Sequence, residues 1–276
     1  MESAQFRLHA DIEENHWWFL ARREIMRRLL RRLVPPAKEA LVVDVGCGTG
    51  ANVAALARDY ECLGLDPSEE AVSFARSRFP DVKFVCGAAP EGLEPFRGRA
   101  RVVLLMDVLE HIDDDREFLS RIVAAVNPGA VVFITVPAGE SLWSEHDVSF
   151  GHFRRYSSES LRALWAELRV SPIICSYYNA RLFPLVKLVR EVTRRRGRAL
   201  GRAGTDFTTP PAFVNRALYR VFAGEAGVLT ALCNGGRARG YRRGVGLVAA
   251  LRKDGDVAAT ESEAAARSWV RRRDRT

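Results

Sequence analysis

The sequence lacks the cysteine and hydrophobic patterns that mark several protein classes. Its five cysteines stand singly, with no Cys-x-x-Cys pair and no Cys-His spacing of the zinc type, which argues against a disulfide framework and a structural metal. No run reaches the roughly 18 consecutive apolar residues that a membrane-spanning helix needs. Residues 1–15 are polar where a secretory signal is apolar. We therefore expect a globular, cytoplasmic protein.

Acidic residues are scarce in residues 181–243, which hold three of them against fourteen basic residues. The whole chain carries a formal net charge of +8, so the remainder is slightly acidic. A local excess of this kind indicates an anionic partner, or a solvated arginine-rich face. The segment is compatible with a cap over a substrate, a helix docked on an anionic membrane surface, or the face of a homodimer. Nucleic acid ranks last because no base-reading motif accompanies the charge.

From residue 41 onward, short apolar runs alternate with helical segments. Runs rich in β-branched residues and separated by helices predict a parallel sheet covered on both faces, and so a doubly wound α/β fold. The predicted strands are 41–45, 61–66, 82–87, 101–107, 131–137, 173–179 and 244–253. The predicted helices lie near 50–59, 67–79, 114–126 and 157–169, and a basic helical segment spans 181–232.

The chain divides into three parts on this pattern. Residues 1–40 are predicted to be an N-terminal helical cap, and residues 41–253 a single α/β domain. The basic helical insertion 181–243 lies within that domain, before its last strand. Residues 254–276 contain too little apolar surface to pack and are predicted to be a mobile tail.

The N-terminal cap contains an amphipathic helix at residues 17–34, which Pro35 ends. Trp17 and Trp18 stand at its start. They form either the core face of the helix or a cover over a ligand pocket, and the two interpretations are compatible.

Residues 41–50, LVVDVGCGTG, end the first predicted strand in a glycine-rich turn. In a doubly wound sheet this turn is where nucleotides bind. No lysine follows the glycines, which excludes the triphosphate loop GxxxxGK[ST]. Gly46, Gly48 and Ala51 match the dinucleotide pattern GxGxxG/A only weakly, although Asp66 stands about twenty residues on, as that pattern requires.

Asp44 distinguishes between the remaining ligands. Its carboxylate stands two residues before the first glycine and places negative charge beside the turn. That charge disfavours a pyrophosphate and favours a ligand that carries an ammonium and a sulfonium. At the end of the second strand, Asp66 would accept hydrogen bonds from ribose hydroxyls in either case.

Four segments follow one another between residues 41 and 137: LVVDVGCGTG, LGLDPSEEAVSFAR, VVLLMDVLEHIDDDREFL and VVFITVP. In this order they resemble the class I S-adenosylmethionine-dependent methyltransferases. WSEHDVSFGHFRRYSSESL and YYNARLFP are similar to a bacterial branch of that superfamily with an N-terminal HWW or HFW segment. The resemblance implies a Rossmann-like, seven-stranded sheet that ends in an antiparallel hairpin. Residues 173–179 and 244–253 would form that hairpin, with the insertion 181–243 between them.

The resemblance also implies a binding site for S-adenosylmethionine and its product S-adenosylhomocysteine. The glycine turn would hold the methionine part, Asp66 the ribose, and Met106 with Asp107 the pocket floor. After Gly87, where the family often has an acid near the adenine amino group, this chain has alanines instead. The implied set is Asp44, Gly46, Cys47, Gly48, Gly50, Asp66, Pro67, Gly87, Ala88, Met106, Asp107, Val108, Trp17 and Trp18.

Methyl transfer from a sulfonium is an in-line displacement, in which the protein mainly aligns the acceptor with an already activated methyl group and excludes water. A hydroxyl or ammonium acceptor must also lose a proton, which a nearby histidine or carboxylate can take. The candidates for this role are His111, His146, His152 and Tyr156, with Glu110 and Asp147 beside them. The spacing of Glu110 and the three histidines establishes no set of metal ligands, so no metal site is predicted.

The sequence thus predicts an S-adenosylmethionine-dependent methyltransferase. Its acceptor would be an oxygen or nitrogen of a small-molecule or carrier- or lipid-linked metabolite, in secondary metabolism or glycoconjugate synthesis. The alternative from another class is a non-catalytic protein that kept the fold and the donor site, and an NAD-dependent oxidoreductase is a weaker competitor. The acceptor itself depends on the shape of the pocket, which no motif reveals.

Overall fold

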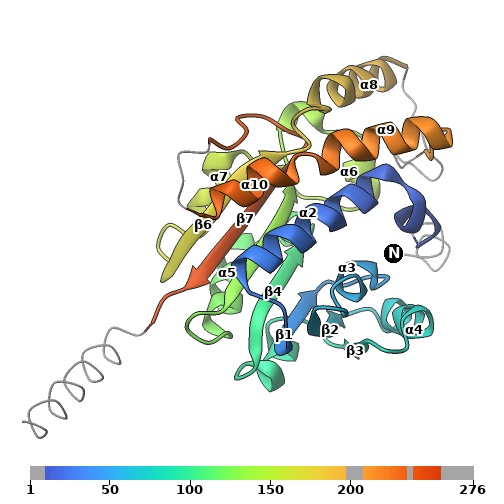
Figure 1. Cartoon of the computed structure of the whole chain (residues 1–276). Coiled ribbons are helices and arrows are strands. Elements are labelled where there is room, and N and C mark those ends of the chain that lie inside the picture. The colour runs from blue at the N-terminus through green and yellow to red at the C-terminus, as the bar shows by residue number, and fades with distance from the viewer. Residues whose placement is uncertain (1–9, 197–207, 235–238, 256–276) are drawn as a thin grey trace, which may run out of the picture.

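The computed structural model describes residues 10–196, 208–234 and 239–255 (Figure 1). Seven strands form one sheet in the order β3-β2-β1-β4-β5-β7-β6. The strands from β1 to β5 pair in parallel, whereas β7 is antiparallel to both β5 and β6. This arrangement confirms the predicted fold class, with its antiparallel end and a helical insertion between the last two strands.

The elements lie close to their predicted positions. The strands are β1 (Ala37–Val45), β2 (Tyr60–Asp66), β3 (Lys83–Cys86), β4 (Ala100–Met106), β5 (Val131–Pro137), β6 (Val170–Tyr178) and β7 (Gly246–Lys253). The helices are α2 (Trp17–Leu33), α3 (Ala51–Ala54), α4 (Glu69–Arg78), α5 (Asp115–Ala124), α6 (Glu145–Ser149), α7 (Ser158–Ala163), α8 (Phe183–Arg196), α9 (Ala212–Ala223) and α10 (Ala226–Leu232). Short 3₁₀ turns occur at Glu91–Phe96, Leu109–His111 and Glu140–Leu142.

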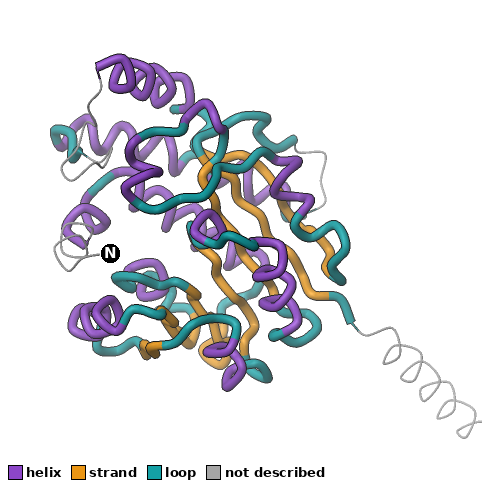
Figure 2. Tube along the Cα trace, turned by 180° about the vertical axis from the view of Figure 1, so that it is seen from behind, coloured by secondary structure: helices purple, strands orange, loops and turns teal. Residues whose placement is uncertain are grey.

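The sheet is buried on both faces, as its continuous apolar strands predict. Neighbouring residues of β1 belong to different cores, because successive side chains of a strand point to opposite faces. Val42 packs in the core formed with α2, α4 and α10, and Val43 in the core formed with α5 and α7. Figures 1 and 2 show these two helical layers from opposite sides.

Several element boundaries differ from the prediction. β1 begins at Ala37, inside the predicted 1–40 cap, because its backbone pairs with Tyr60 of β2 beyond the end of the apolar run. The helix expected at 50–59 covers only Ala51–Ala54, and the chain then runs through turns to β2. The helix expected at 157–169 is likewise reduced to Ser158–Ala163.

Further details concern the loop between the fifth predicted strand and the helix expected at 157–169, the insertion and the tail. The loop 138–156 contains a short helix, α6, which Ser144 and Asp147 cap reciprocally. The described residues of the basic segment form three helices, α8 to α10, as its predicted helical character requires. Most of the predicted mobile tail, from residue 256 onward, lies outside the described residues.

The insertion packs against the N-terminal helix rather than standing apart. α2 contacts both α9 and α10, and the three helices run together across one face of the sheet (Figure 1). The ring of Trp18 lies 5.3 Å from that of Phe222 in α9 and 6.2 Å from that of Tyr178 in β6, measured between centroids. Among the described helices, none combines the length and the apolar character that crossing a bilayer requires.

Candidate active site

A cavity of about 780 Å³ opens at the carboxyl ends of the parallel strands. It lies where the strand order reverses between β1 and β4, the place at which doubly wound sheets bind ligands. The glycine turn after β1 and the 3₁₀ turn after β4 form two of its walls, and the start of α2 forms a third. Residues from α8 and from the loop after β5 close the remaining side.

The glycine turn is held by β2. The amides of Gly46 and Cys47 both donate to the carbonyl of Leu65, at 2.8 and 3.2 Å. Asp66 then uses both carboxylate oxygens, since Oδ2 accepts from the Gly48 amide at 2.8 Å and Oδ1 from the Ser68 amide at 2.9 Å. Each oxygen retains a lone pair, so the carboxylate that shapes the turn can also accept from a ligand.

Two of the glycines are required by conformation and space. Gly46 has a φ of +69°, and a Cβ there would come within 2.9 Å of the Val108 side chain. Gly50 has a φ of +84°, and its Cβ would meet the Phe84 ring at 2.7 Å. Any other residue at either position would therefore disturb both the turn and the packing beneath it.

Arg22 and Asp107 form an ion pair on the cavity wall. Asp107 follows β4 in a left-handed backbone conformation, with a φ of 58°, which aspartate tolerates better than most residues. Its Oδ1 accepts from the Thr135 hydroxyl at 3.0 Å, while Oδ2 accepts from the guanidinium of Arg22, which is only 6% exposed.

Most of the residues implied for the donor site lie on this cavity. Asp44, Gly50 and Gly87 are not on its wall. Gly50 begins α3, and the amide of Gly87 donates to the carbonyl of Asp66 at 2.9 Å, so both act on the pocket through the backbone. The implied residues that line the cavity are Gly46, Cys47, Gly48, Asp66, Pro67, Ala88, Met106, Asp107, Val108, Trp17 and Trp18.

Asp44 lies beneath the glycine turn, 1% exposed, and its Oδ2 has no hydrogen-bond partner among the described residues. Burial raises the pKa of this carboxyl from 3.8 to about 7; Asp66 and Glu13 act in the same direction, whereas Arg22 opposes them. Asp44 is thus buried and does not line the cavity in the structure, and its role toward a cationic ligand stays a prediction.

Asp44→Asn is expected to change how stability depends on pH. The pKa of Asp44 is higher in the folded chain than in the unfolded one, so the folded state binds more protons between these values and loses stability as the pH rises from about 4 to about 7. Across this range the raised pKa of Asp44 changes the free energy of unfolding by on the order of 4 kcal/mol, at about 1.4 kcal/mol per pKa unit. Urea unfolding of ligand-free protein across this range measures it. If the free energies of unfolding of the wild type and the variant differ by the same amount at every pH, the raised pKa of Asp44 is contradicted.

The opposite side of the cavity gathers three of the predicted proton acceptors. His111, His146 and His152 all line it. Burial lowers the pKa of His111 to about 4 and that of His146 to about 3, so both rings are neutral and weakly basic near pH 7. The fourth candidate, Tyr156, is not on the wall, because its hydroxyl donates to Asp115 Oδ2 at 2.6 Å within the core.

Asp147 holds the third histidine in place. Its Oδ1 lies 2.8 Å from Nδ1 of His152 and also accepts from Nε of Arg155 at 2.9 Å. Its Oδ2 accepts from the Ser144 amide at 2.9 Å. Burial alone would raise the pKa of this carboxyl, but the contacts with His152 and Arg155 outweigh it and hold the pKa well below its usual range.

Glu110, beside His111 in the 3₁₀ turn, is completely buried, and burial raises its pKa to about 8. Sequence reasoning did not single out Glu13 or Asn52, which also line the cavity. Glu13 accepts from the Thr49 hydroxyl at 2.7 Å and so ties the N-terminal segment to the glycine turn. No local pattern signals Glu13, because it reaches the cavity from the N-terminal segment, far along the chain from the glycine turn.

Residues 18–180, more than half of the chain, match the family described as methyltransferase domain. The chain belongs to this family. Its fold is that of the class I S-adenosylmethionine-dependent methyltransferases, which confirms the resemblance seen in residues 41–137 and the donor that goes with it. Membership of the branch with the N-terminal HWW segment stays a prediction.

Similarity to individual members of the family is partial. A "probable S-adenosylmethionine-dependent methyltransferase" of Mycolicibacterium smegmatis is 30% identical over 127 residues, which are 46% of this chain and 48% of that protein. The ubiquinone biosynthesis O-methyltransferase of Erwinia tasmaniensis is 32% identical over 99 residues, covering 34% of this chain and 41% of that protein. The chain thus spans about half the length of the curated relatives it matches, or less.

Among solved structures, the plantazolicin methyltransferase BamL, in complex with a desmethyl analogue and S-adenosylhomocysteine, has a TM-score of 0.54 and 14% sequence identity. The match covers 91% of this chain and 90% of BamL. At such low identity the likeness shows the shared methyltransferase fold alone.

Proposed function

We propose that this methyltransferase transfers the methyl group of S-adenosylmethionine to a hydroxyl oxygen of an acceptor with an apolar body. The observation that supports it is a single cavity with the glycine turn and Asp66 on one side and His152 on the other. A donor and a proton-accepting group can therefore meet in one enclosed space. Catalysis of methyl transfer needs mainly this alignment and the exclusion of water.

The donor half would use the residues around the glycine turn. The turn itself would hold the methionine part, and Asp66 would accept from the ribose hydroxyls with its remaining lone pairs. Trp17 and Trp18 line the cavity from the start of α2 and would cover the donor. Both rings also pack on Phe222, so the two tryptophans would stabilise the core and cover the donor at the same time.

In the proposed step, a lone pair of the acceptor oxygen forms the bond to the methyl carbon as the carbon–sulfur bond breaks. The bonding electrons return to sulfur, which leaves as the neutral thioether of S-adenosylhomocysteine, and the hydroxyl proton passes to an imidazole. We assign this role to His152, because the hydrogen bond between Nδ1 and Asp147 orients its ring and leaves Nε2 to accept the proton. His111 and His146 are less suitable, since their pKa values lie at about 4 and about 3.

The apolar body of the acceptor is inferred from the walls next to this step. Leu182, Leu185, Val186 and Val189, in and just before α8, line the cavity together with Leu218 of α9. Leu185 is 49% exposed and Leu188, one turn further, is 62% exposed, so apolar surface continues outward along α8. A lipid-linked metabolite would match this path, with its chain leaving the cavity along the helix.

The positive charge of the insertion is partly used within the protein. Arg190 pairs with Asp147 at 3.8 Å, while Arg194 and Arg195 both pair with Glu191 on the surface of α8. Peripheral binding to an anionic membrane, which would bring a lipid-linked acceptor to the cavity, remains part of this proposal. A homodimer through the same helices remains the other prediction for this segment.

Binding and turnover test the proposal in two steps. Calorimetry should show binding of S-adenosylhomocysteine and none of NADH, and the reverse result would replace the methyltransferase with an oxidoreductase. Radiolabelled donor is then offered with alkyl phenols of increasing chain length, and with alkylamines of the same lengths as controls. We expect methylation of the phenols, with a KM that falls as the chain lengthens. Tight donor binding without turnover on either series would favour the non-catalytic alternative.

A further inference from the structure

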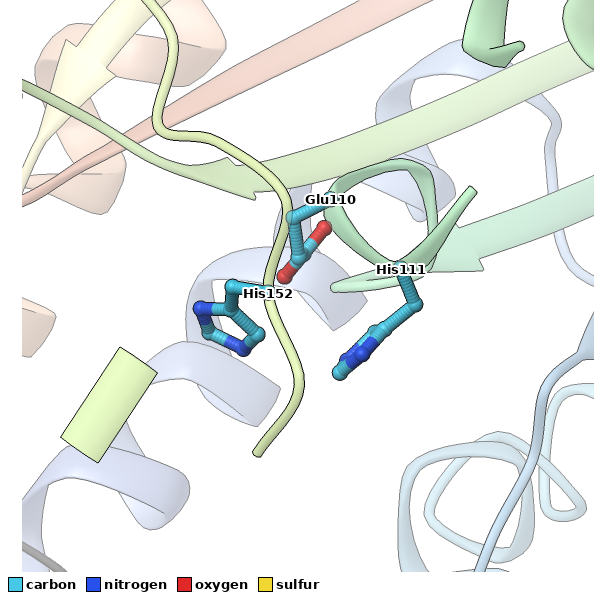
Figure 3. A group of neighbouring side chains, drawn as sticks. All are labelled: Glu110, His111 and His152. Atoms are coloured by element: carbon cyan, nitrogen blue, oxygen red, sulfur yellow. The ribbon is translucent and has the colours of Figure 1, made fainter. Parts of the chain in front are cut away.

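The structure brings together three side chains whose spacing in the sequence does not indicate a metal site. Glu110 and His111 belong to the 3₁₀ turn after β4, and His152 comes from the loop after β5 (Figure 3). One oxygen or nitrogen atom of each lies within 4.8 Å of those of the other two. The two imidazole rings are 4.7 Å apart between centroids and nearly perpendicular, at 80°.

Glu110 has no hydrogen-bonding partner that accounts for its position. The residue is 0% exposed, and apart from a contact with its own backbone amide neither carboxylate oxygen has a hydrogen-bond partner among the described residues. The nearby guanidinium groups of Arg22 and Arg155 act on it only at a distance, since both are hydrogen-bonded to other carboxylates. A buried carboxyl without a partner is costly, and a cation held between it and its neighbours would remove that cost.

The two histidines are oriented as metal ligands commonly are. Asp147 is hydrogen-bonded to Nδ1 of His152 at 2.8 Å, which leaves Nε2 as the nitrogen available to a metal ion. A carboxylate on the far nitrogen is the usual support of a metal-binding imidazole, because it sets the tautomer and the direction of the ring. The ring of His111 lies beside the backbone of Phe150 and Gly151, which raises its pKa against the larger effect of burial.

We propose that Glu110, His111 and His152 bind a divalent transition-metal ion, such as Zn²⁺, whose open coordination positions face the acceptor half of the cavity. Two imidazoles with one carboxylate suit zinc, iron, cobalt or manganese rather than magnesium or calcium, which prefer oxygen ligands. Bonds of about 2.0 to 2.2 Å place ligand atoms roughly 3.3 Å apart. The three groups, now within 4.8 Å of one another, would therefore need to approach one another by at most about 1.5 Å.

This inference rests on the proposed function and changes one part of it. With the ion bound, Nε2 of His152 is a ligand and no longer the proton acceptor. The ion instead lowers the pKa of the acceptor hydroxyl, so that its proton leaves to water before the oxygen attacks the methyl carbon. The bonds formed and broken at carbon and sulfur stay the same.

Cobalt binding tests the site without any donor or acceptor. The full-length protein is stripped with a chelator, dialysed and titrated with Co²⁺, while visible absorption and calorimetry are recorded. We expect one tight site per chain, with the ligand-field absorption of nitrogen and oxygen ligands, and displacement of Co²⁺ by Zn²⁺. Absence of a saturable site in the wild-type protein would overturn the proposal, whatever the variants do.

Variants identify the ligands. Glu110→Gln and His152→Gln should each weaken Co²⁺ binding by at least about tenfold, with circular dichroism confirming that they fold. His146→Gln is the matched control, because His146 lines the same cavity but is not one of the three, and its Co²⁺ affinity should match that of the wild type. A loss confined to His146→Gln, or unchanged binding in the other two variants, would overturn this ligand set.

The same samples separate this inference from the proposed function. Chelator-treated wild-type protein is titrated with S-adenosylhomocysteine and assayed with the alkyl phenols, with and without added Zn²⁺. Rates that rise at least about tenfold with Zn²⁺ support the metal site. Donor binding and turnover that need no ion would overturn the metal site and leave His152 as the base. Failure to bind S-adenosylhomocysteine, with or without Zn²⁺, would instead count against the proposed function.

Discussion

Replacing Asp66 with alanine is expected to weaken the binding of S-adenosylhomocysteine by about 100-fold, or about 2.7 kcal/mol. Two effects contribute. The carboxylate would accept charge-assisted hydrogen bonds from the ribose, and it already holds the amides of Gly48 and Ser68 that shape the turn. Calorimetric titration of the wild type and the variant measures the difference directly.

Two further variants show whether the loss arises at the proposed contact. Asp66→Asn keeps one oxygen and should lose less affinity than Asp66→Ala. Asp81→Ala removes an exposed carboxylate just before the start of β3 that does not line the cavity, and the affinity of this variant should equal that of the wild type. An Asp66→Ala affinity within about twofold of the wild type, or less than about 0.5 kcal/mol, would exclude the ribose assignment.

Asp147→Ala should reduce the free energy of unfolding by about 3 to 5 kcal/mol. Asp147 is 0% exposed and joins the His152 ring, the Arg155 guanidinium and the Ser144 amide at one carboxylate. Its removal leaves the guanidinium of Arg155 in the interior without its charged partner, although the Ala138 carbonyl still accepts from it at 3.2 Å. Urea unfolding followed by circular dichroism measures the change.

Asp113→Ala is the matched control for this experiment. Asp113 also pairs with an arginine, Arg154 at 3.6 Å, but its side chain is 89% exposed. An exposed ion pair contributes between about 0 and 1 kcal/mol, so this variant should unfold close to the wild type. Equal losses in the two variants would mean that the network around Asp147 does not stabilise the loop 138–156 as the structure indicates.

The fold was largely predictable because it depends on patterns that repeat over a few residues. Continuous apolar runs such as residues 131–137 can only be strands buried on both faces, and the structure has β5 at those residues. Helix lengths were less predictable. The apolar pattern at residues 50–59 suits a longer helix, but the chain turns after Ala54 to enter β2.

The donor half of the site was also predictable in part, because its residues lie in one short segment and at the ends of strands. Glycines with positive φ, such as Gly46, have a local cause that a motif records. Asp44 shows the limit of such reasoning. Its position two residues before Gly46 suggested a contact with the ligand, yet alternation along β1 turns it beneath the loop, and only the structure shows which side it faces.

By itself, the sequence determined the alternation of strands and helices, the place of the glycine turn and the family to which the chain belongs, since each depends on residues close together along the chain. The tertiary structure alone decided which distant groups meet. Arg22 reaches Asp107, Asp147 orients His152, and Glu110 lies beside both histidines of the candidate metal site. The physical reason is that ion pairs and hydrogen bonds depend on the distance between groups in space, a few ångströms, and not on their separation along the chain.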